Sequence, residues 1–177
     1  TFSQALQKSL RSLEKRGSSF HWNQNVTPVE DLLEIIKKPT DGRIVNVQQA
    51  LLKGATPEQV FESTMIDPWF IDQIVLINEI ALQIRAASDL TSDLMKLGKM
   101  HGFSDHQIGE LRRLSEADVR NLRHKMGLRP VFKTVDTCAG EFPALTPYHY
   151  STYEQETEVE ATDRKKVIIL GSGPNRI

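Results

Sequence analysis

Apolar residues recur at intervals of three and four positions along the first 128 residues, a spacing typical of amphipathic helices. Each periodic stretch opens with a serine, threonine or aspartate that can cap a first turn, as in TPEQ at 56–59. Glycines such as Gly54 and Gly102 follow the stretches and favour helix ends. The pattern predicts helices at residues 3–16, 28–37, 43–53, 57–64, 68–87, 92–101, 105–112 and 116–126.

The longest periodic stretch is DPWFIDQIVLINEIALQIRAA at 67–87, with Asp67 as its cap and Pro68 at the first helical position. Its main apolar stripe comprises Phe70, Ile74, Ile77, Ala81 and Ile84. Further apolar residues widen the stripe on both sides, so this helix needs cover from more than one direction. We expect a mainly α fold, an irregular domain of about eight short helices around this one long central helix. Most of its apolar residues are interpreted as core, and some are left open to face another subunit.

The pattern changes after residue 128, where prolines, two short β-like runs and an acidic stretch replace the helical period. Residues 129–163 are therefore predicted to be an extended linker segment, with the acidic run 154–163 in solvent. Five aromatic side chains in this segment are expected to pack against a neighbouring domain or the helical body: Phe132, Phe142, Tyr148, Tyr150 and Tyr153.

The stretch KKVIILGSGPNRI at 165–177 has the pattern of a buried strand that runs into a glycine turn. Such a strand needs partner strands and a crossover helix, so we interpret it as a single β-strand belonging to a truncated α/β domain. A second interpretation is that the strand pairs with the β-like run near 131–136 and that the turn is an ordinary surface loop. The GSG turn is a weak nucleotide-binding signal by itself.

Charge and composition exclude several classes of protein. The 22 basic and 23 acidic residues nearly cancel, so no strong overall field attracts nucleic acid or an anionic membrane. The longest apolar run, at 167–170, is far shorter than a membrane span, and the N-terminus lacks a signal pattern. A single cysteine, Cys138, cannot form an internal disulfide. These features predict a cytoplasmic protein.

No catalytic, cofactor-binding or metal-binding residue can be assigned from residue chemistry. The five histidines are scattered, and none pairs with another at helical spacing, which disfavours a metal site. A thiolate pair of Cys138 with His149 is conceivable, but a buried or interfacial structural cysteine fits better. The acidic residues lie in predicted caps, solvent faces and the linker.

A nucleic-acid-binding module is the alternative from another functional class. Residues 104–129 contain two short helices joined tightly, and the second carries Arg120, Arg123, His124 and Lys125, so a helix-turn-helix reader is conceivable. Three acidic residues interrupt this basic face: Glu110, Glu116 and Asp118. Phosphate binding generally needs a continuous basic stripe, which disfavours this hypothesis.

Several longer motifs resemble one family. FKTVDTCAGEF at 132–142, YHYSTYE at 148–154 and KKVIILGSGPNRI at 165–177 resemble the large subunit of carbamoyl-phosphate synthetase, at the junction of its two homologous synthetase halves. The resemblance extends back through FSQALQKSLRSLE at 2–14 and DPWFIDQI at 67–74. It covers essentially the whole chain.

The resemblance implies a division into three parts. Residues 1–128 would be the helical oligomerisation or connector domain, residues 129–163 the linker, and residues 164–177 the first strand and turn of a truncated, Rossmann-like pre-ATP-grasp domain. The family's connector is an oligomerisation domain, so a homo-oligomer is expected. The exposed faces of the helices near 43–64 and 92–126 are the expected contact surfaces.

The family makes carbamoyl phosphate from bicarbonate, ammonia derived from glutamine and two ATP, for arginine and pyrimidine biosynthesis. The resemblance implies an ATP-dependent ligase with ATP and Mg²⁺ or Mn²⁺ in each synthetase half, and a glutaminase small subunit as partner. No such cofactor is assigned to these residues. The fragment is expected to be inactive alone and to hold the two halves in register.

Arg176 is the one functional candidate that the resemblance provides. In the family, the arginine of the GxGPNRI motif faces the interior route between the active sites, so Arg176 is a candidate for the path of the intermediate or for an interdomain contact. A simple turn arginine that pairs with a carboxylate is an equal alternative. Asn175, Gly171 and Gly173 are expected to shape the turn rather than to hold phosphate.

Overall fold

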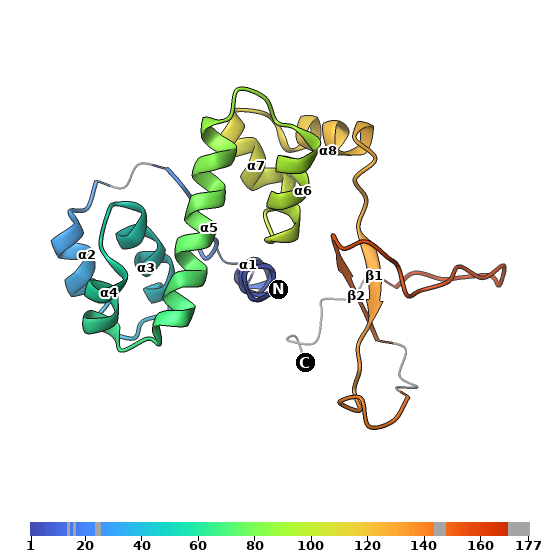
Figure 1. Ribbon diagram of the computed structural model, residues 1–177, viewed down its shortest axis with the longest axis horizontal. Coiled ribbons are helices and arrows are strands. Elements are labelled where there is room, and N and C mark those ends of the chain that lie inside the picture. Colours follow the sequence, from blue (N-terminus) through green and yellow to red (C-terminus); the bar gives the residue numbers. More distant parts are fainter. Residues whose placement is uncertain (14, 16, 24–25, 144–147, 170–177) are drawn as a thin grey trace. The chain divides into compact units, whose positions relative to one another are not determined.

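The computed structural model describes residues 1–13, 15, 17–23, 26–143 and 148–169, which form two compact units, Thr1–Pro130 and Val131–Ile177. The described residues are mainly helical, in agreement with the predicted fold class (Figure 1). The elements are α1 (Phe2–Ser12), α2 (Val29–Ile35), α3 (Arg43–Leu52), α4 (Pro57–Thr64), α5 (Pro68–Ala86), α6 (Ser92–Met100), α7 (Asp105–Arg112), α8 (Glu116–Lys125), β1 (Val131–Thr134) and β2 (His149–Thr152).

Most helices begin at a side-chain cap, as the sequence predicts, but α2 and α3 start after Pro28 and Gly42 without a side-chain cap. In α4, the Thr56 hydroxyl accepts from the Gln59 N–H at 3.2 Å, and Gln59 Oε1 accepts from the Thr56 N–H at 2.9 Å. Ser104 and Gln107 form the same reciprocal pair at the start of α7, at 3.0 Å in both directions. Each pair satisfies two amide groups that lack a helical partner, so a local sequence signal is enough to set the helix start.

The largest difference from the predicted helix bounds is in the first helix. The pattern predicts a first helix that extends to residue 16, whereas α1 ends at Ser12. The chain turns there, because the Lys15 carbonyl accepts from both the N–H and the hydroxyl of Ser18, at 3.1 and 2.7 Å. Gly17, with φ of 80°, lies inside this turn rather than at the end of the helix.

Helix α5 is the central element of the first unit. Figure 1 shows α2, α3 and α4 on one side of it and α6 and α7 on the other, and α1 also packs against it. Its buried residues are Ile71, Ile74, Ile77, Asn78, Ile80, Ala81 and Ile84. The predicted stripe is wrong at Phe70, which is 43% exposed, because neighbouring helices cover the Ile71 face of the first turn instead.

Buried amide side chains connect these helices across the core. Asn78 Oδ1 accepts from Trp22 Nε1 at 3.0 Å and from Gln48 Nε2 at 2.8 Å. Gln107 Nε2 donates to Gln7 Oε1 at 3.1 Å, which connects α7 to α1. Each pair satisfies groups that would otherwise be costly to bury, so the amides help to fix how the helices pack.

The second unit contains a two-stranded antiparallel sheet. Its register pairs Val131 with Thr152 and Thr134 with His149. On the other edge of β1, the Glu158 N–H donates to the Phe132 carbonyl at 2.8 Å, and Glu158 Oε2 accepts from the Thr134 N–H at 2.8 Å. The Thr134 N–H and the Lys133 ammonium lower the pKa of the Glu158 carboxyl. Part of the predicted solvated acidic run is therefore bound to β1.

These contacts rule out one interpretation of the final strand. The hypothesis that residues near 131–136 pair with the 167–170 run is wrong for the described residues, because β2 and Glu158 occupy the two edges of β1. Residues 165–169 form no strand, and Val167, Ile168 and Ile169 are between 84% and 88% exposed. Residues 170–177, including the GSG turn, lie outside the described part of the chain.

Most of the aromatic residues of the second unit are exposed, and their packing against a neighbouring domain stays a prediction. Phe132, Phe142, Tyr148 and Tyr150 are between 46% and 69% exposed, because a two-stranded hairpin is too small to bury them itself. Tyr153 is half-buried.

Among the helices that the structure describes, none is both long and apolar enough to span a bilayer.

Candidate functional site

The predicted functional residue cannot be placed. Arg176 lies outside the described residues, as do Gly171, Gly173 and Asn175. Three other groups of side chains in the first unit are candidate sites. They are an exposed aromatic cluster, a cavity lined by arginines (the arginine cavity) and three buried charged side chains (the ion triad).

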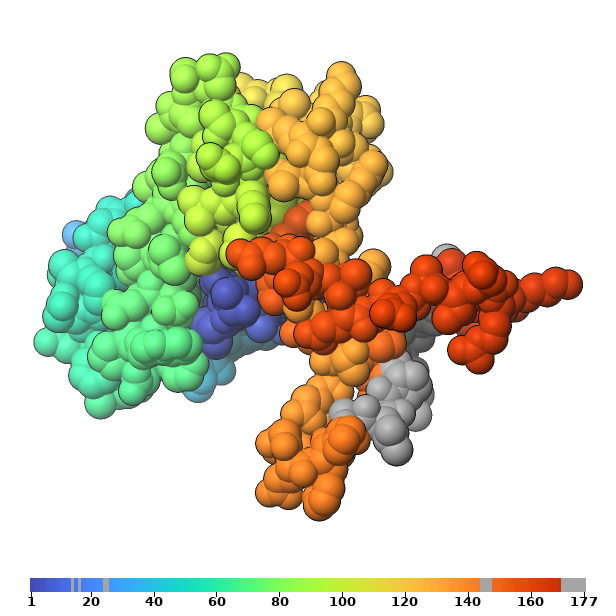
Figure 2. Space-filling view, turned by 45° about the vertical axis from the view of Figure 1, so that its right-hand side comes forward, coloured from blue at the N-terminus to red at the C-terminus, as the bar shows by residue number. Residues whose placement is uncertain are grey.

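The aromatic cluster consists of Phe2, Trp69 and Phe70. The ring of Phe2 lies 5.2 Å from each of the other two rings, and Trp69 and Phe70 are 5.0 Å apart. Asp67 fixes this turn, since its carboxylate accepts from the Trp69 N–H at 2.9 Å. Trp69 is 52% exposed, and Figure 2 shows the dark blue residues of α1 beside the green residues of α5 at the surface.

Sequence reasoning missed this cluster. The predicted contact surfaces were the helices near 43–64 and 92–126, whereas these aromatic side chains lie at the starts of α1 and α5. The sequence feature that could have indicated the cluster is the pair Trp69–Phe70 in the first turn after Pro68. A first turn can extend beyond the neighbouring helices, which then leave its side chains exposed. The periodic stripe placed Phe70 in the core.

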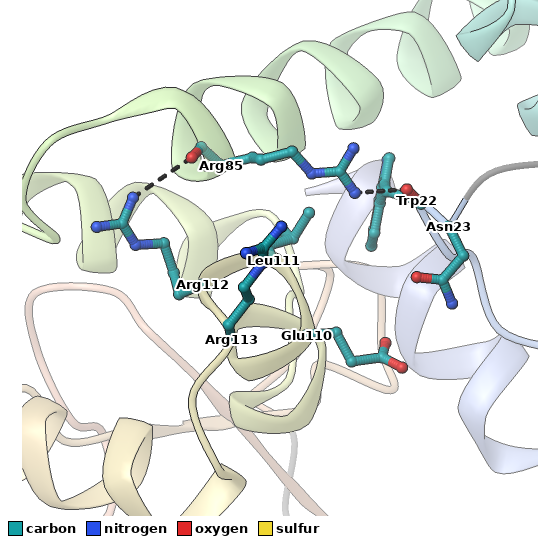
Figure 3. A pocket seen from close by; sticks show the side chains of 7 residues that line it. All are labelled: Trp22, Asn23, Arg85, Glu110, Leu111, Arg112 and Arg113. Carbon is teal, nitrogen blue, oxygen red and sulfur yellow. Dashed lines mark hydrogen bonds between the residues drawn. The ribbon is translucent and has the colours of Figure 1, made fainter.

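The arginine cavity has a volume of about 560 Å³ (Figure 3). It lies between the ends of α5 and α7 and the segment that carries Trp22. Its lining residues are Trp22, Asn23, Arg85, Glu110, Leu111, Arg112 and Arg113. Sequence periodicity does not reveal it, because its walls come from positions far apart in the chain.

Arg112 holds one wall of the cavity together. Its guanidinium donates to the carbonyl of Ile84 at 3.1 Å, to that of Ser88 at 3.0 Å and to that of Ala87. One carbonyl lies in the last turn of α5 and two lie just after it, so a single side chain from α7 caps the end of α5. Arg112 is therefore a structural residue.

We expect Arg112→Lys to lower the free energy of unfolding by about 1–2 kcal/mol, because one ammonium cannot reach carbonyls that a planar guanidinium bridges. Urea unfolding followed by circular dichroism measures the change. Arg113→Lys, at the neighbouring exposed position, is the matched control and should alter the free energy by less than about 0.5 kcal/mol. Equal losses in both variants would show that the carbonyl contacts of Arg112 do not stabilise the fold.

Arg113 differs from Arg112 in both backbone and side chain. It follows α7 in the left-handed conformation, with φ of 57°, and its N–H donates to the Gly109 carbonyl. Its guanidinium donates to no acceptor among the described residues. Figure 3 shows its side chain extending from the end of α7 toward α5. The helix end therefore places an unused cation in the cavity.

The opposite wall of the cavity is rigid. Trp22 is buried, donates to Asn78 Oδ1 and stacks on Phe103, with ring centres 5.1 Å apart and an angle of 25° between the rings. Its carbonyl accepts from Arg85 Nη2 at 2.5 Å. Trp22 and Arg85 thus have fixed positions relative to the cavity.

Lys99, Asp105 and Arg123 form the buried ion triad. Their side chains are between 7% and 8% exposed. Asp105 Oδ1 accepts from Lys99 Nζ at 2.8 Å, and Oδ2 accepts from Arg123 Nη2 at 2.8 Å. Burial opposes ionisation of Asp105, but the hydrogen bonds from Arg123 and Lys99 hold its pKa below the ordinary value. Burial lowers the pKa of Lys99.

The ion triad also bears on the helix-turn-helix alternative. Arg123, one of its four proposed basic residues, is buried against Asp105, and Arg120 pairs with Glu116 at 2.5 Å. The second helix thus offers less basic surface than the sequence suggests, and nothing in the structure supports nucleic-acid binding by this pair of helices.

Two further side chains that could carry chemistry, those of His101 and Cys138, lie in local hydrogen-bonded surroundings. His101 Nδ1 and the Ser3 hydroxyl are 2.9 Å apart, and burial lowers the pKa of His101. Cys138 is half-buried in a turn where the Asp136 carboxylate accepts from its N–H at 2.9 Å. In the described ranges, no group of three His, Cys, Asp or Glu residues is arranged to hold a metal ion.

Comparison with known proteins places the chain in a family. The family described as "Carbamoyl-phosphate synthetase large chain, oligomerisation domain" matches residues 1–127. The carbamoyl phosphate synthase large chain of Clavibacter sepedonicus is 68% identical over 99% of this chain, and those of Kineococcus radiotolerans and Streptomyces coelicolor are each 56% identical over 99% of it. The chain spans 16% of the length of each relative. The chain therefore belongs to the carbamoyl-phosphate synthetase large-chain family, and residues 1–127 are its oligomerisation domain.

Proposed function

We propose that this chain is the oligomerisation and interdomain connector region of the large subunit of a glutamine-dependent carbamoyl-phosphate synthetase. The observation that carries the proposal is the family match over residues 1–127, which coincides with the helical unit Thr1–Pro130. In this proposal, residues 1–128 form the connector, residues 129–163 link it to the second synthetase half, and residues 164–177 begin that half.

The parent enzyme would make carbamoyl phosphate from bicarbonate, ammonia released from glutamine and two ATP, in the cytoplasm, for arginine and pyrimidine biosynthesis. ATP, with Mg²⁺ or Mn²⁺, would supply the phosphoryl groups in the synthetase halves, and a glutaminase small subunit would supply ammonia. This chain would hold the two halves in register and would be inactive alone. An assay of bicarbonate-dependent ATP hydrolysis by the isolated chain tests the last point, and measurable turnover would contradict it.

The exposure of the final apolar run supports the proposed start of the second half. Val167, Ile168 and Ile169 are exposed here, whereas a parallel strand of this composition is normally buried on both faces. In the proposal, they enter the sheet of the pre-ATP-grasp domain. Arg176, in the turn that follows, would then face the route of the intermediate or an interdomain contact.

The aromatic cluster supports a role in self-association. Exposed tryptophan and phenylalanine side chains are enriched where protein surfaces meet, and a rigid aromatic group costs little conformational entropy when it is covered. Phe2, Trp69 and Phe70 hold one another at ring distances of 5.0–5.2 Å, so the surface is preformed. We propose that this cluster is part of the contact between copies of the large subunit.

We expect Trp69→Ser to weaken self-association about thirtyfold or more, which corresponds to the loss of roughly 2 kcal/mol at a hot spot. Sedimentation velocity of the chain over a wide concentration range measures this change. Val26→Ser is the matched control, because Val26 is an isolated apolar side chain that is 95% exposed. A monomer at every concentration, or equal weakening by both substitutions, would contradict the proposed contact.

A further inference from the structure

The arginine cavity carries more positive charge than its structural role requires. Three arginines and one glutamate line it. Arg112 is occupied by the carbonyls at the end of α5. Arg85 uses one nitrogen, Nη2, on the Trp22 carbonyl, and the guanidinium of Arg113 has no acceptor within the described ranges. Two cationic groups thus face the cavity with donors to spare.

The backbone conformation of Arg113 is a second sign that its side chain is not needed for the fold. A non-glycine residue in the left-handed region costs roughly 1–2 kcal/mol, and asparagine or glycine tolerates the position better than arginine does. The conformation at the end of α7 therefore does not favour arginine at this position. Binding of a ligand in the cavity by the guanidinium would explain why an arginine is present.

We propose that the arginine cavity binds a small anion that carries a phosphate or carboxylate group, held between the guanidinium groups of Arg113 and Arg85. A planar guanidinium binds either group through two parallel hydrogen bonds, which makes these oxyanions the matching ligands. The volume of about 560 Å³ lies in the range of small-molecule sites. The buried and stacked ring of Trp22 gives the site a rigid wall.

A neighbouring cavity extends the site. It has a volume of about 890 Å³, shares Asn23 and Glu110 with the arginine cavity, and adds Arg11 and His21 to the lining. The uncharged body of a larger ligand would have room there while its anionic group remains between Arg85 and Arg113. Glu110, at the shared boundary, repels an anion and would favour ligands whose negative charge stays at the arginine end.

The test uses the natural reporter in the wall. The chain has two tryptophans, so Trp69→Phe leaves Trp22 as the sole indole. Fluorescence and isothermal titration calorimetry would follow additions of pyrophosphate in one series and citrate in another, with chloride at equal ionic strength as the reference. We expect saturable binding of at least one anion. Binding of pyrophosphate alone identifies a phosphate site, and binding of citrate alone identifies a carboxylate site.

Substitutions locate the binding site. Arg113→Asn tolerates the left-handed backbone while removing the guanidinium, and should weaken binding about tenfold. Arg129→Asn removes an exposed arginine that lines neither cavity, and should change affinity less than about twofold. Glu110→Gln should strengthen binding about threefold. Thermal melts of each variant check that the fold persists.

Three results would overturn the proposal. One is the absence of saturable heat or fluorescence change with both anions. Another is equal weakening by Arg113→Asn and Arg129→Asn, which would indicate a response to overall charge. The third is binding that Glu110→Gln weakens. None of these measurements depends on self-association through the aromatic cluster, so the proposed oligomeric role and the anion site stand or fall separately.

Discussion

Asp105→Asn is expected to lower the free energy of unfolding of the helical unit by about 3–5 kcal/mol, because it leaves two buried cations without their shared carboxylate. Lys99 and Arg123 each approach Asp105 within 2.8 Å, and all three side chains are at most 8% exposed. An asparagine fills the same volume, so the loss reports charge and hydrogen bonding rather than packing. Asp105 also begins α7, where a negative charge interacts favourably with the helix dipole.

Urea unfolding monitored by circular dichroism measures this effect, with an unchanged slope required for the comparison. Asp89→Asn is the matched control, since Asp89 is exposed in the segment between α5 and α6, and should change the free energy by less than about 0.5 kcal/mol. A loss below about 1 kcal/mol for Asp105→Asn would show that the ion triad is closer to neutral than its burial suggests.

The same carboxylate predicts a pH dependence. The pKa of Asp105 in the folded chain lies below its unfolded value, so the folded state binds the proton less readily than the unfolded state. The stability that Asp105 confers is fully present above the unfolded pKa, at about 4, and is lost as the pH falls through the folded pKa. The stability difference between the wild type and Asp105→Asn should therefore shrink in acid. A constant difference down to pH 2 would contradict this account.

Gly102→Ala is the second large expected effect, a loss of about 3 kcal/mol that combines backbone strain with overpacking. Gly102 ends the turn after α6 with φ of 90°, and a Cβ there would lie 2.8 Å from the Cα of Gln4. That atom belongs to the backbone of α1 and cannot rotate away. Gln7 Nε2 and Arg11 Nη1 also bind the carbonyls of His101 and Gly102, at 2.9 and 2.8 Å, so α1 would have to move as a whole.

Two glycine controls separate the strain from the clash. Gly54→Ala introduces the same kind of left-handed strain, with φ of 103°, but its Cβ would meet no atom within 4 Å, so about 1 kcal/mol should be lost. Gly42→Ala has an ordinary φ and only one contact, at 4.0 Å, so it should be nearly neutral. Thermal and urea unfolding of the three variants gives the comparison. Equal losses for Gly102→Ala and Gly54→Ala would show that α1 moves away from the added Cβ with no loss of stability.

The sequence predicts best those features that depend on neighbouring residues. Thr56 with Gln59 and Ser104 with Gln107 lie three positions apart, so a local signal suffices for the helix starts that the structure confirms. The central place of α5 follows from its length and its wide apolar arc. Phe70 shows the limit, since a stripe marks the apolar residues but not how far the neighbouring helices extend to cover them.

The candidate sites could not be predicted because they depend on distant pairs. Arg112 reaches carbonyls 24–28 positions earlier, and Arg123 meets Asp105 from another helix. Sequence periodicity does not distinguish Arg112, whose guanidinium binds backbone carbonyls, from Arg113, whose guanidinium has no acceptor among the described residues. The helix-turn-helix hypothesis includes Arg123 in a basic face, because the sequence does not reveal its contact with Asp105. The role of Arg176 stays a prediction, because the residues around it lie outside the described ranges.

The hydrogen bonds between Glu158 and β1 shorten the effective linker to any domain attached after Glu158. Thr134 and Glu158 are 24 positions apart in sequence, yet the Thr134 N–H and Glu158 Oε2 are separated by only 2.8 Å. A fully extended chain of that contour length would span roughly 80 Å. A domain attached after Val159 therefore explores a much smaller volume, which raises its effective concentration at a docking position. Extra residues between β1 and β2 would leave the distance that such a domain can move from β1 unchanged. Extra residues after Val159 would increase that distance.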